Sequence, residues 1–153
     1  MNINVFKEFE KMKVIPFIIN NAHLFTKGFE HCGEANGYVA IPPTNKYYGL
    51  PCNSPEVESL SVHGGITFSE FVTLKDTTCN GVHRVKPELV GRRNQLLTEN
   101  ELWFLGDKPI EIPDDWFILG FDTCHPGDNK NKWDEDRVAE ETYDLAILLD
   151  KGE

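Results

Sequence analysis

The residues best suited to carry chemistry follow the most apolar segment of the chain, residues 116–121. Asp122, His125 and Asp128 lie directly after it, where a Pro-Gly pair interrupts the chain. If residues 116–121 form a strand, Asp122 projects from the same face as Gly120, and the break allows His125 and Asp128 to fold back toward it. Donors at this spacing could bind a divalent metal ion, and the carboxylate of Asp122 could act in catalysis.

A histidine elsewhere in the chain could complete such a metal site. His63 precedes two glycines in the segment at residues 62–68. Together with Asp122, His125 and Asp128 it would give two histidines and two carboxylates, a set suited to zinc, manganese or iron. A metal held in this way lowers the pKa of a bound water, which can then attack an ester, an amide or a phosphodiester.

The same residues also have a structural interpretation. An aspartate before a Pro-Gly break often forms an Asx-turn, in which its carboxylate accepts backbone N–H groups. Asp122 would then serve the turn, and Asp128 would cap the turn that follows. A polar ligand pocket without a metal is a third interpretation, and the sequence leaves all three open.

Two further segments could bind an anionic ligand. Gly64 and Gly65 allow backbone N–H groups to approach a phosphate closely, and Thr67 follows them, although a tight hairpin would use the same glycines. The connection between residues 74 and 95 is the one locally basic region. The arginines there that could clamp phosphate oxygens are Arg84, Arg92 and Arg93, with a solvated loop as the alternative.

Length and charge limit the possible partners. The chain has 153 residues, with 25 acidic and 15 basic side chains and a formal charge of -10. This balance predicts one globular domain and argues against nucleic acid or an anionic membrane surface as a partner. No apolar run approaches the roughly 20 residues of a membrane span, and the N-terminus has no apolar signal region, so we expect a cytoplasmic protein.

The cysteines give no sign of a metal site or a disulfide framework. The four cysteines are Cys32, Cys52, Cys79 and Cys124, and no two of them form a Cys-x-x-Cys motif. Disulfides are uncommon in a chain of this length without a secretion signal. We therefore expect reduced and mostly buried thiols.

The hydrophobic pattern predicts a single α+β domain over residues 1–153, with a central, mainly antiparallel sheet and a C-terminal helix packed across it. We expect a helix at residues 4–12 followed by irregular structure to residue 36, a β-rich core at 37–128 and a helix at 134–150. The predicted strands are residues 14–19 (an edge strand, marked by Pro16), 38–41, 60–62, 66–74 and 116–121. Residues 96–104 could form a helix or a strand.

The C-terminal helix is the clearest of these elements. Asp134 or Asp136 could cap its N-terminus, and the Lys151–Gly152 pair marks its end. Apolar or small side chains then recur at helical spacing, which predicts one buried face. The residues of this face are Val138, Thr142, Leu145, Ala146 and Leu149.

The two motifs resemble those of a family of small proteins encoded by bacteriophages and prophages. Its members pair an HGG(L/I)T motif with an aromatic GFD-x-x-H-x-GD motif and a C-terminal helix. Here these motifs are residues 63–67 and 120–128, and the likeness extends from Gly37 to Leu149. The resemblance implies a phage protein in the cytoplasm of the bacterial host. Small accessory phage proteins often counter host defence by destroying or sequestering nucleotide signals.

Three functions are compatible with these features. The first is a metal-dependent hydrolase, using zinc or manganese, that acts on a small phosphorylated or nucleotide-like substrate, with Asp122 or Glu141 as the catalytic carboxylate. The second is a protein that binds such a ligand without turning it over. A third possibility is an acidic inhibitor that covers a basic partner protein.

Overall fold

The computed structural model describes residues 12–21, 25, 28, 30–71, 102–104, 112–113 and 115–153, and of residues 102–104 it describes only the backbone. The strands are β1 (Ile15–Asn20), β2 (Ala35–Ile41), β3 (Phe68–Phe71), β4 (Leu102–Phe104) and β5 (Phe117–Phe121), and the helices are α3 (Pro55–Glu58) and α5 (Glu135–Asp150). The helix predicted at residues 4–12 lies outside the described residues except for Met12.

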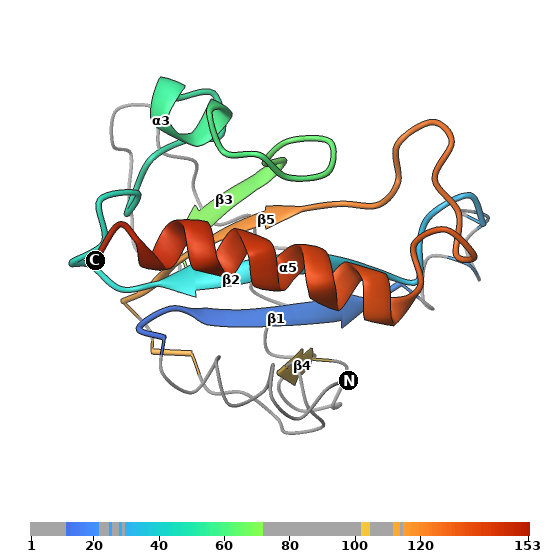
Figure 1. Ribbon diagram of the computed structural model, residues 1–153, viewed down its shortest axis with the longest axis horizontal. Coiled ribbons are helices and arrows are strands. Elements are labelled where there is room, and N and C mark those ends of the chain that lie inside the picture. The colour runs from blue at the N-terminus through green and yellow to red at the C-terminus, as the bar shows by residue number, and fades with distance from the viewer. Residues whose placement is uncertain are drawn as a thin grey trace.

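The strands form one sheet in the order β3-β5-β2-β1-β4. All of the described pairings are antiparallel. Helix α5 lies across one face of this sheet, where it contacts β2 and β1 (Figure 1). The predicted α+β architecture is thereby confirmed.

Helix α5 packs on the sheet through the face predicted from its sequence. Asp134 is the residue that caps it, because its side chain accepts the N–H of Arg137 at 2.9 Å. The residues of the predicted stripe are all fully buried: Val138, Thr142, Leu145, Ala146 and Leu149. A side chain at Gly37 of β2 would overlap Thr142, so this glycine lets the helix approach the sheet closely. No helix in the described part of the chain is long and apolar enough to cross a membrane.

Strand β5 is buried on both faces, as its continuous apolar sequence predicts. Phe117, Leu119 and Phe121 join the core beneath α5. Ile118 joins a second apolar cluster on the opposite face, with Phe17, Ile19 and Ala40. Asp122 follows directly after this strand, at the point where its run of buried apolar residues ends.

Two strand predictions are wrong. Residues 60–62 are irregular, because Val57 and Leu60 are buried at the end of α3 and the chain then turns. β1 is an inner strand rather than an edge strand, since it pairs with both β2 and β4. Pro16 itself pairs with Val39 of β2, and the described pairing with β4 covers residues 17–19. Residues 102–104 form a strand, and residues 96–101 lie outside the described residues.

Candidate functional site

The candidate site forms where two loops meet at one end of the sheet. Phe68, the first residue of β3, pairs with Gly120 near the end of β5, and the N–H of Thr67 donates to the carbonyl of Gly120 at 2.9 Å. The strands are antiparallel, so the start of one lies beside the end of the other. The loop that carries His63 therefore meets the loop that carries Asp122 and the residues after it.

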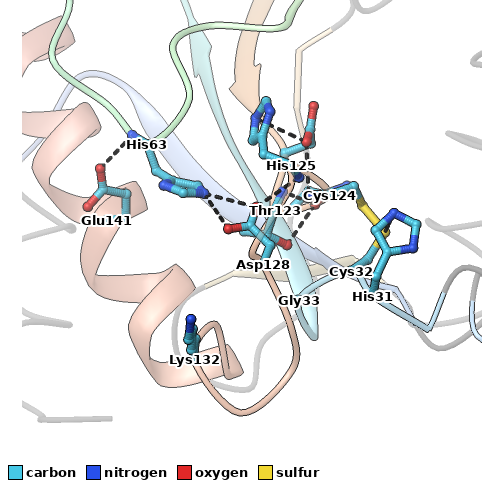
Figure 2. A network of polar contacts seen from close by, with 12 residues as sticks. His31, Cys32, Gly33, His63, Thr123, Cys124, His125, Asp128, Lys132 and Glu141 are labelled. Atoms are coloured by element: carbon cyan, nitrogen blue, oxygen red, sulfur yellow. Dashed lines mark hydrogen bonds and ion pairs between the residues drawn. A yellow bond between two sulfur atoms is a disulfide. The ribbon is translucent and has the colours of Figure 1, made fainter.

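His63 and Asp128 make the central contact of this cluster (Figure 2). The Nε2 of His63 lies 3.0 Å from each carboxylate oxygen of Asp128, so this ring nitrogen donates to a pair of acceptors. The side chain of Asp128 is 6% exposed and that of His63 is 24% exposed. The main-chain N–H of His63 donates to Oε1 of Glu141 on α5 at 2.8 Å. Asp128 thus orients the imidazole, and Glu141 fixes the backbone that carries it.

The carboxyl group of Asp128 is held as an anion. Burial acts to raise its pKa, but hydrogen bonds from the ring of His63 and the N–H of His125, together with the charges of both imidazoles, lower that pKa below its usual range. The N–H of His125 donates to Oδ2 of Asp128 at 2.9 Å. Asp128 therefore presents a buried carboxylate to the ring of His63 and to the backbone of His125.

A second imidazole and carboxylate lie beside this pair. Nε2 of His125 is 3.3 Å from Oδ1 of Asp122, and each of these side chains is 32% exposed. This nitrogen atom is buried and has no aligned hydrogen-bond partner within the described residues. Oδ1 of Asp122 also accepts the N–H of Cys124 at 2.9 Å, which is the Asx-turn that the sequence left open. Asp122 and Asp128 therefore both hold backbone turns and lie next to imidazole rings.

The two imidazoles lie edge to face. Their ring centroids, in His63 and His125, are 5.5 Å apart with an interplanar angle of 80°. Gly64 makes this approach possible, because a Cβ atom there would lie 2.6 Å from Cδ2 of His125 and closer still to its Nε2. Gly64 also has a φ of 69°, in a turn closed by the N–H of Gly65 and the carbonyl of Val62 at 2.9 Å. The glycine is needed both for the turn and for the imidazole beside it.

Trp133, at the end of the other loop, and Arg137, in the first turn of α5, support His63. The Trp133 ring centroid lies 4.0 Å from that of His63 at an angle of 34°, and Cζ of Arg137 lies 4.1 Å from the Trp133 centroid. Trp133 is 6% exposed, so the stack is largely shielded from water. The sequence motifs did not identify Trp133 as a neighbour of His63. Its position five residues after Asp128, directly before the helix cap Asp134, was the available signal.

The structure brings together most, but not all, of the predicted site residues. His63, Asp122, His125, Asp128 and Glu141 lie at this end of the sheet, with Gly64 packed on one imidazole. The side chain of Thr67 is exposed, and the N–H of Gly65 is used within its own turn. Arg84, Arg92 and Arg93 lie outside the described residues.

The cluster differs from a preformed metal centre. Nε2 of His63 faces Asp128, and Nε2 of His125 faces Asp122, so each imidazole is directed at a carboxylate rather than at a shared point. Over the described ranges, no group of three or more His, Cys, Asp and Glu side chains is arranged to hold a metal ion. In this arrangement the carboxylates can orient the imidazoles for proton transfer.

The expectation of reduced thiols is wrong for two cysteines. Cys32 and Cys124 form a disulfide between residues that are 92 positions apart. Cys32 precedes β2 and Cys124 follows β5, and these strands pair with Gly37 opposite Phe121, which brings the two cysteines to the same end of the sheet. Cys52 is a free thiol, and Cys79 lies outside the described residues.

Comparisons with protein-family models, with curated proteins and with solved structures found no match to this chain. The geometry of the two imidazole–carboxylate pairs is therefore the basis for a functional assignment. Both pairs lie on loops supported by paired strands and by α5, which is where a rigid scaffold presents functional groups.

Proposed function

We propose that this protein is a hydrolase of a small phosphorylated or nucleotide-like substrate, and that His63 and His125 act as its acid–base pair. The observation that carries this proposal is the pair of imidazoles 5.5 Å apart, each within 3.3 Å of a carboxylate. Histidine is the side chain best suited to proton transfer near neutral pH.

His63 is suited to the role of general base. Its Nε2 donates to Asp128, which fixes the tautomer and leaves Nδ1 with a lone pair that can take a proton from water. The anionic Asp128 then stabilises the imidazolium that forms, because the two groups are 3.0 Å apart and the carboxylate is buried. The backbone bond to Glu141 and the stack on Trp133 limit the motion of the ring.

His125 is suited to the role of general acid. In the proposed reaction the oxygen of water forms a bond to phosphorus as its proton passes to His63. The bond from phosphorus to the leaving oxygen breaks, and the imidazolium of His125 gives its proton to that oxygen. Oδ1 of Asp122 lies 3.3 Å from Nε2 of this imidazole and orients the ring for the transfer. Loss of the product and exchange of one proton between the rings through solvent restore the starting state.

A phosphorylated substrate is favoured by the chemistry of these groups. Phosphoryl transfer needs proton transfer at the attacking and leaving oxygens together with positive charge near the phosphate. Two histidines supply the first, and Arg84, Arg92 and Arg93 remain the predicted source of the second. The resemblance of the two motifs to those of phage proteins is in keeping with a nucleotide-like substrate.

The proposal can be tested by hydrolysis assays on the purified full chain. The probes are bis(p-nitrophenyl) phosphate and a panel of linear and cyclic nucleotides, with products separated by chromatography. His63→Gln and Asp128→Asn should each lower the rate by roughly 10²- to 10⁴-fold, the usual contribution of a positioned acid or base. Asp144→Asn, at an exposed aspartate of α5, is the matched control and should leave the rate unchanged.

Three outcomes separate the alternatives. Hydrolysis that survives both substitutions would refute the acid–base roles. Recovery of an intact nucleotide from the denatured protein, with no turnover, would assign ligand binding in place of hydrolysis. Stoichiometric zinc or manganese by elemental mass spectrometry, with activity lost in chelator, would assign a metal-dependent mechanism to the same residues.

A further inference from the structure

The disulfide between Cys32 and Cys124 lies next to the candidate site but has no part in the proposed hydrolysis. Its two cysteines differ in their exposure: the residue Cys32 is 1% exposed, whereas the residue Cys124 is partly exposed. A thiol from solution can therefore reach Cys124 more readily than Cys32. Figure 2 shows the disulfide between the loop of His125 and the segment before β2.

A histidine lies beside the buried sulfur. Nε2 of His31 is 4.0 Å from Sγ of Cys32 (Figure 2). An imidazole at this position stabilises a thiolate on Cys32. Thiol–disulfide exchange is faster when the sulfur that leaves forms a more stable thiolate. The two cysteines are thus suited to different roles. Cys124, which is partly exposed, is the one attacked, and Cys32, which is buried beside His31, is the one that leaves.

Hydrogen bonds outside the disulfide hold the same two segments together. The N–H of Gly33 donates to the carbonyl of Thr123 at 2.8 Å, and Oγ1 of Thr123 donates to the carbonyl of Ala35 at 2.6 Å. A side chain at Gly33 would overlap Thr123, which shows how closely the segments approach. These contacts would keep the two cysteines adjacent after reduction, so that the disulfide can form again.

We propose that Cys32 and Cys124 form a redox-active pair that undergoes reversible exchange with an external dithiol while the chain stays folded. A cytoplasmic location, which the sequence predicts, fits this assignment, because cytoplasmic disulfides are usually transient, catalytic or redox-sensing. Cys124 lies between Asp122 and His125, so the exchange acts on the segment that carries the second imidazole. The exchange does not depend on hydrolysis.

The exchange balances without any further co-reactant. One thiolate of the dithiol attacks Sγ of Cys124, a mixed disulfide forms, and Cys32 leaves as a thiolate that takes up a proton. The second thiolate of the dithiol then attacks the first dithiol sulfur, which is bonded to Cys124 in the mixed disulfide. Cys124 leaves as a thiolate and is protonated. The protein gains two electrons and two protons, and the dithiol becomes a cyclic disulfide.

The test follows the thiols directly. The native full chain is treated with millimolar dithiothreitol, quenched with iodoacetamide at intervals and digested, and the alkylated peptides are measured by mass spectrometry. We expect Cys32 and Cys124 to become labelled in the folded protein, with an unchanged far-ultraviolet circular dichroism spectrum. A reduced sample that is freed of dithiothreitol and treated with oxidised glutathione before the iodoacetamide quench should no longer be labelled at these two positions. His31→Asn should slow the reduction by roughly three- to tenfold, because the leaving thiolate loses its imidazole.

Glu30→Gln is the matched control, since Glu30 is the exposed neighbour of His31. It should leave the rate of reduction unchanged. Labelling of Cys32 and Cys124 only after denaturation would overturn the proposal and assign a purely structural disulfide. Equal rates for His31→Asn and the wild type would overturn the role of the imidazole, and free thiols at both positions in the oxidised buffer would overturn the pair itself.

Discussion

The two adjacent glycines of the His63 loop allow a sharp test of how the site is packed. Gly64 and Gly65 have φ angles of 69° and 78°, in the left-handed region that side chains disfavour. Substitution of either by alanine therefore costs about 1–2 kcal/mol in backbone strain. They differ in their surroundings: a Cβ atom on Gly64 would overlap the imidazole of His125, whereas no described atom lies within 4 Å of a Cβ atom on Gly65.

Gly64→Ala should thus carry an additional cost that Gly65→Ala does not. The side chain of His125 is 32% exposed, so the ring can rotate away rather than compress the core. It would then lose the contact with Asp122, about 0.2–1 kcal/mol for a partly exposed ion pair, and the edge-to-face contact with His63, about 0.5–1.5 kcal/mol. The expected difference between the two variants is therefore about 0.7–2.5 kcal/mol.

Urea denaturation of both variants and the wild type measures this difference. With an m-value of roughly 2 kcal/mol/M, the midpoint of Gly64→Ala should lie about 0.4–1.2 M below that of Gly65→Ala, with equal slopes. The imidazole resonances of His125 should shift in the first variant and not in the second. Equal midpoints together with an unmoved His125 would refute the packing described for this loop.

Three further predictions concern the carboxylate, the cross-link and the core. The folded-state pKa of Asp128 lies below its unfolded value of about 3.9, so its contribution to stability is present above that pH and is lost as the pH falls through the folded pKa. The unfolding free energy of Asp128→Asn should therefore depend less on pH than that of the wild type between about pH 5 and pH 2, and an equal dependence would contradict this. Replacement of Cys32 and Cys124 by serine should lower the unfolding free energy by up to about 4.6 kcal/mol, the chain-entropy value for a 92-residue loop, and no change in the thermal midpoint would show that the cross-link is absent. Leu145→Ala, at a fully buried position, should cost about 2–5 kcal/mol by chemical denaturation, and should cost more than Leu148→Ala on the partly buried side of the helix.

The sequence predicts the parts of this molecule that depend on local periodicity. The buried face of α5, from Val138 to Leu149, follows from apolar spacing at 3.6 residues per turn, and the two-sided burial of β5 follows from its uninterrupted apolar run. The meeting of His63 with the loop after β5 was correctly predicted from the types of residue involved. The sequence could not specify that its partner is Asp128 rather than Asp122, because that choice depends on the register of β3 against β5.

The disulfide and the position of β1 within the sheet could not be predicted from local periodicity. Cys32 and Cys124 are too far apart in the chain for their spacing to indicate a bond, and only the pairing of β2 with β5 brings them together. Pro16 favours an edge strand, yet β1 pairs with β2 through Pro16 itself and with β4 through residues 17–19. In both cases the outcome depends on contacts between segments that are distant in sequence, which composition and periodicity do not encode.

In the described sheet β3 is a terminal strand of four residues, and it pairs only with β5. Short terminal strands detach from a sheet at a fraction of the free energy of global unfolding. Such a local opening would remove the support that β3 gives to the loop of His63 while the packing of α5 on the central strands persisted, leaving the contacts with Glu141 and Trp133 to hold the ring. Slippage by a single residue would displace the imidazole by about 3.3 Å and reverse the faces of the strand. The contact between His63 and Asp128 is therefore less durable than the fold, and it can be lost before global unfolding.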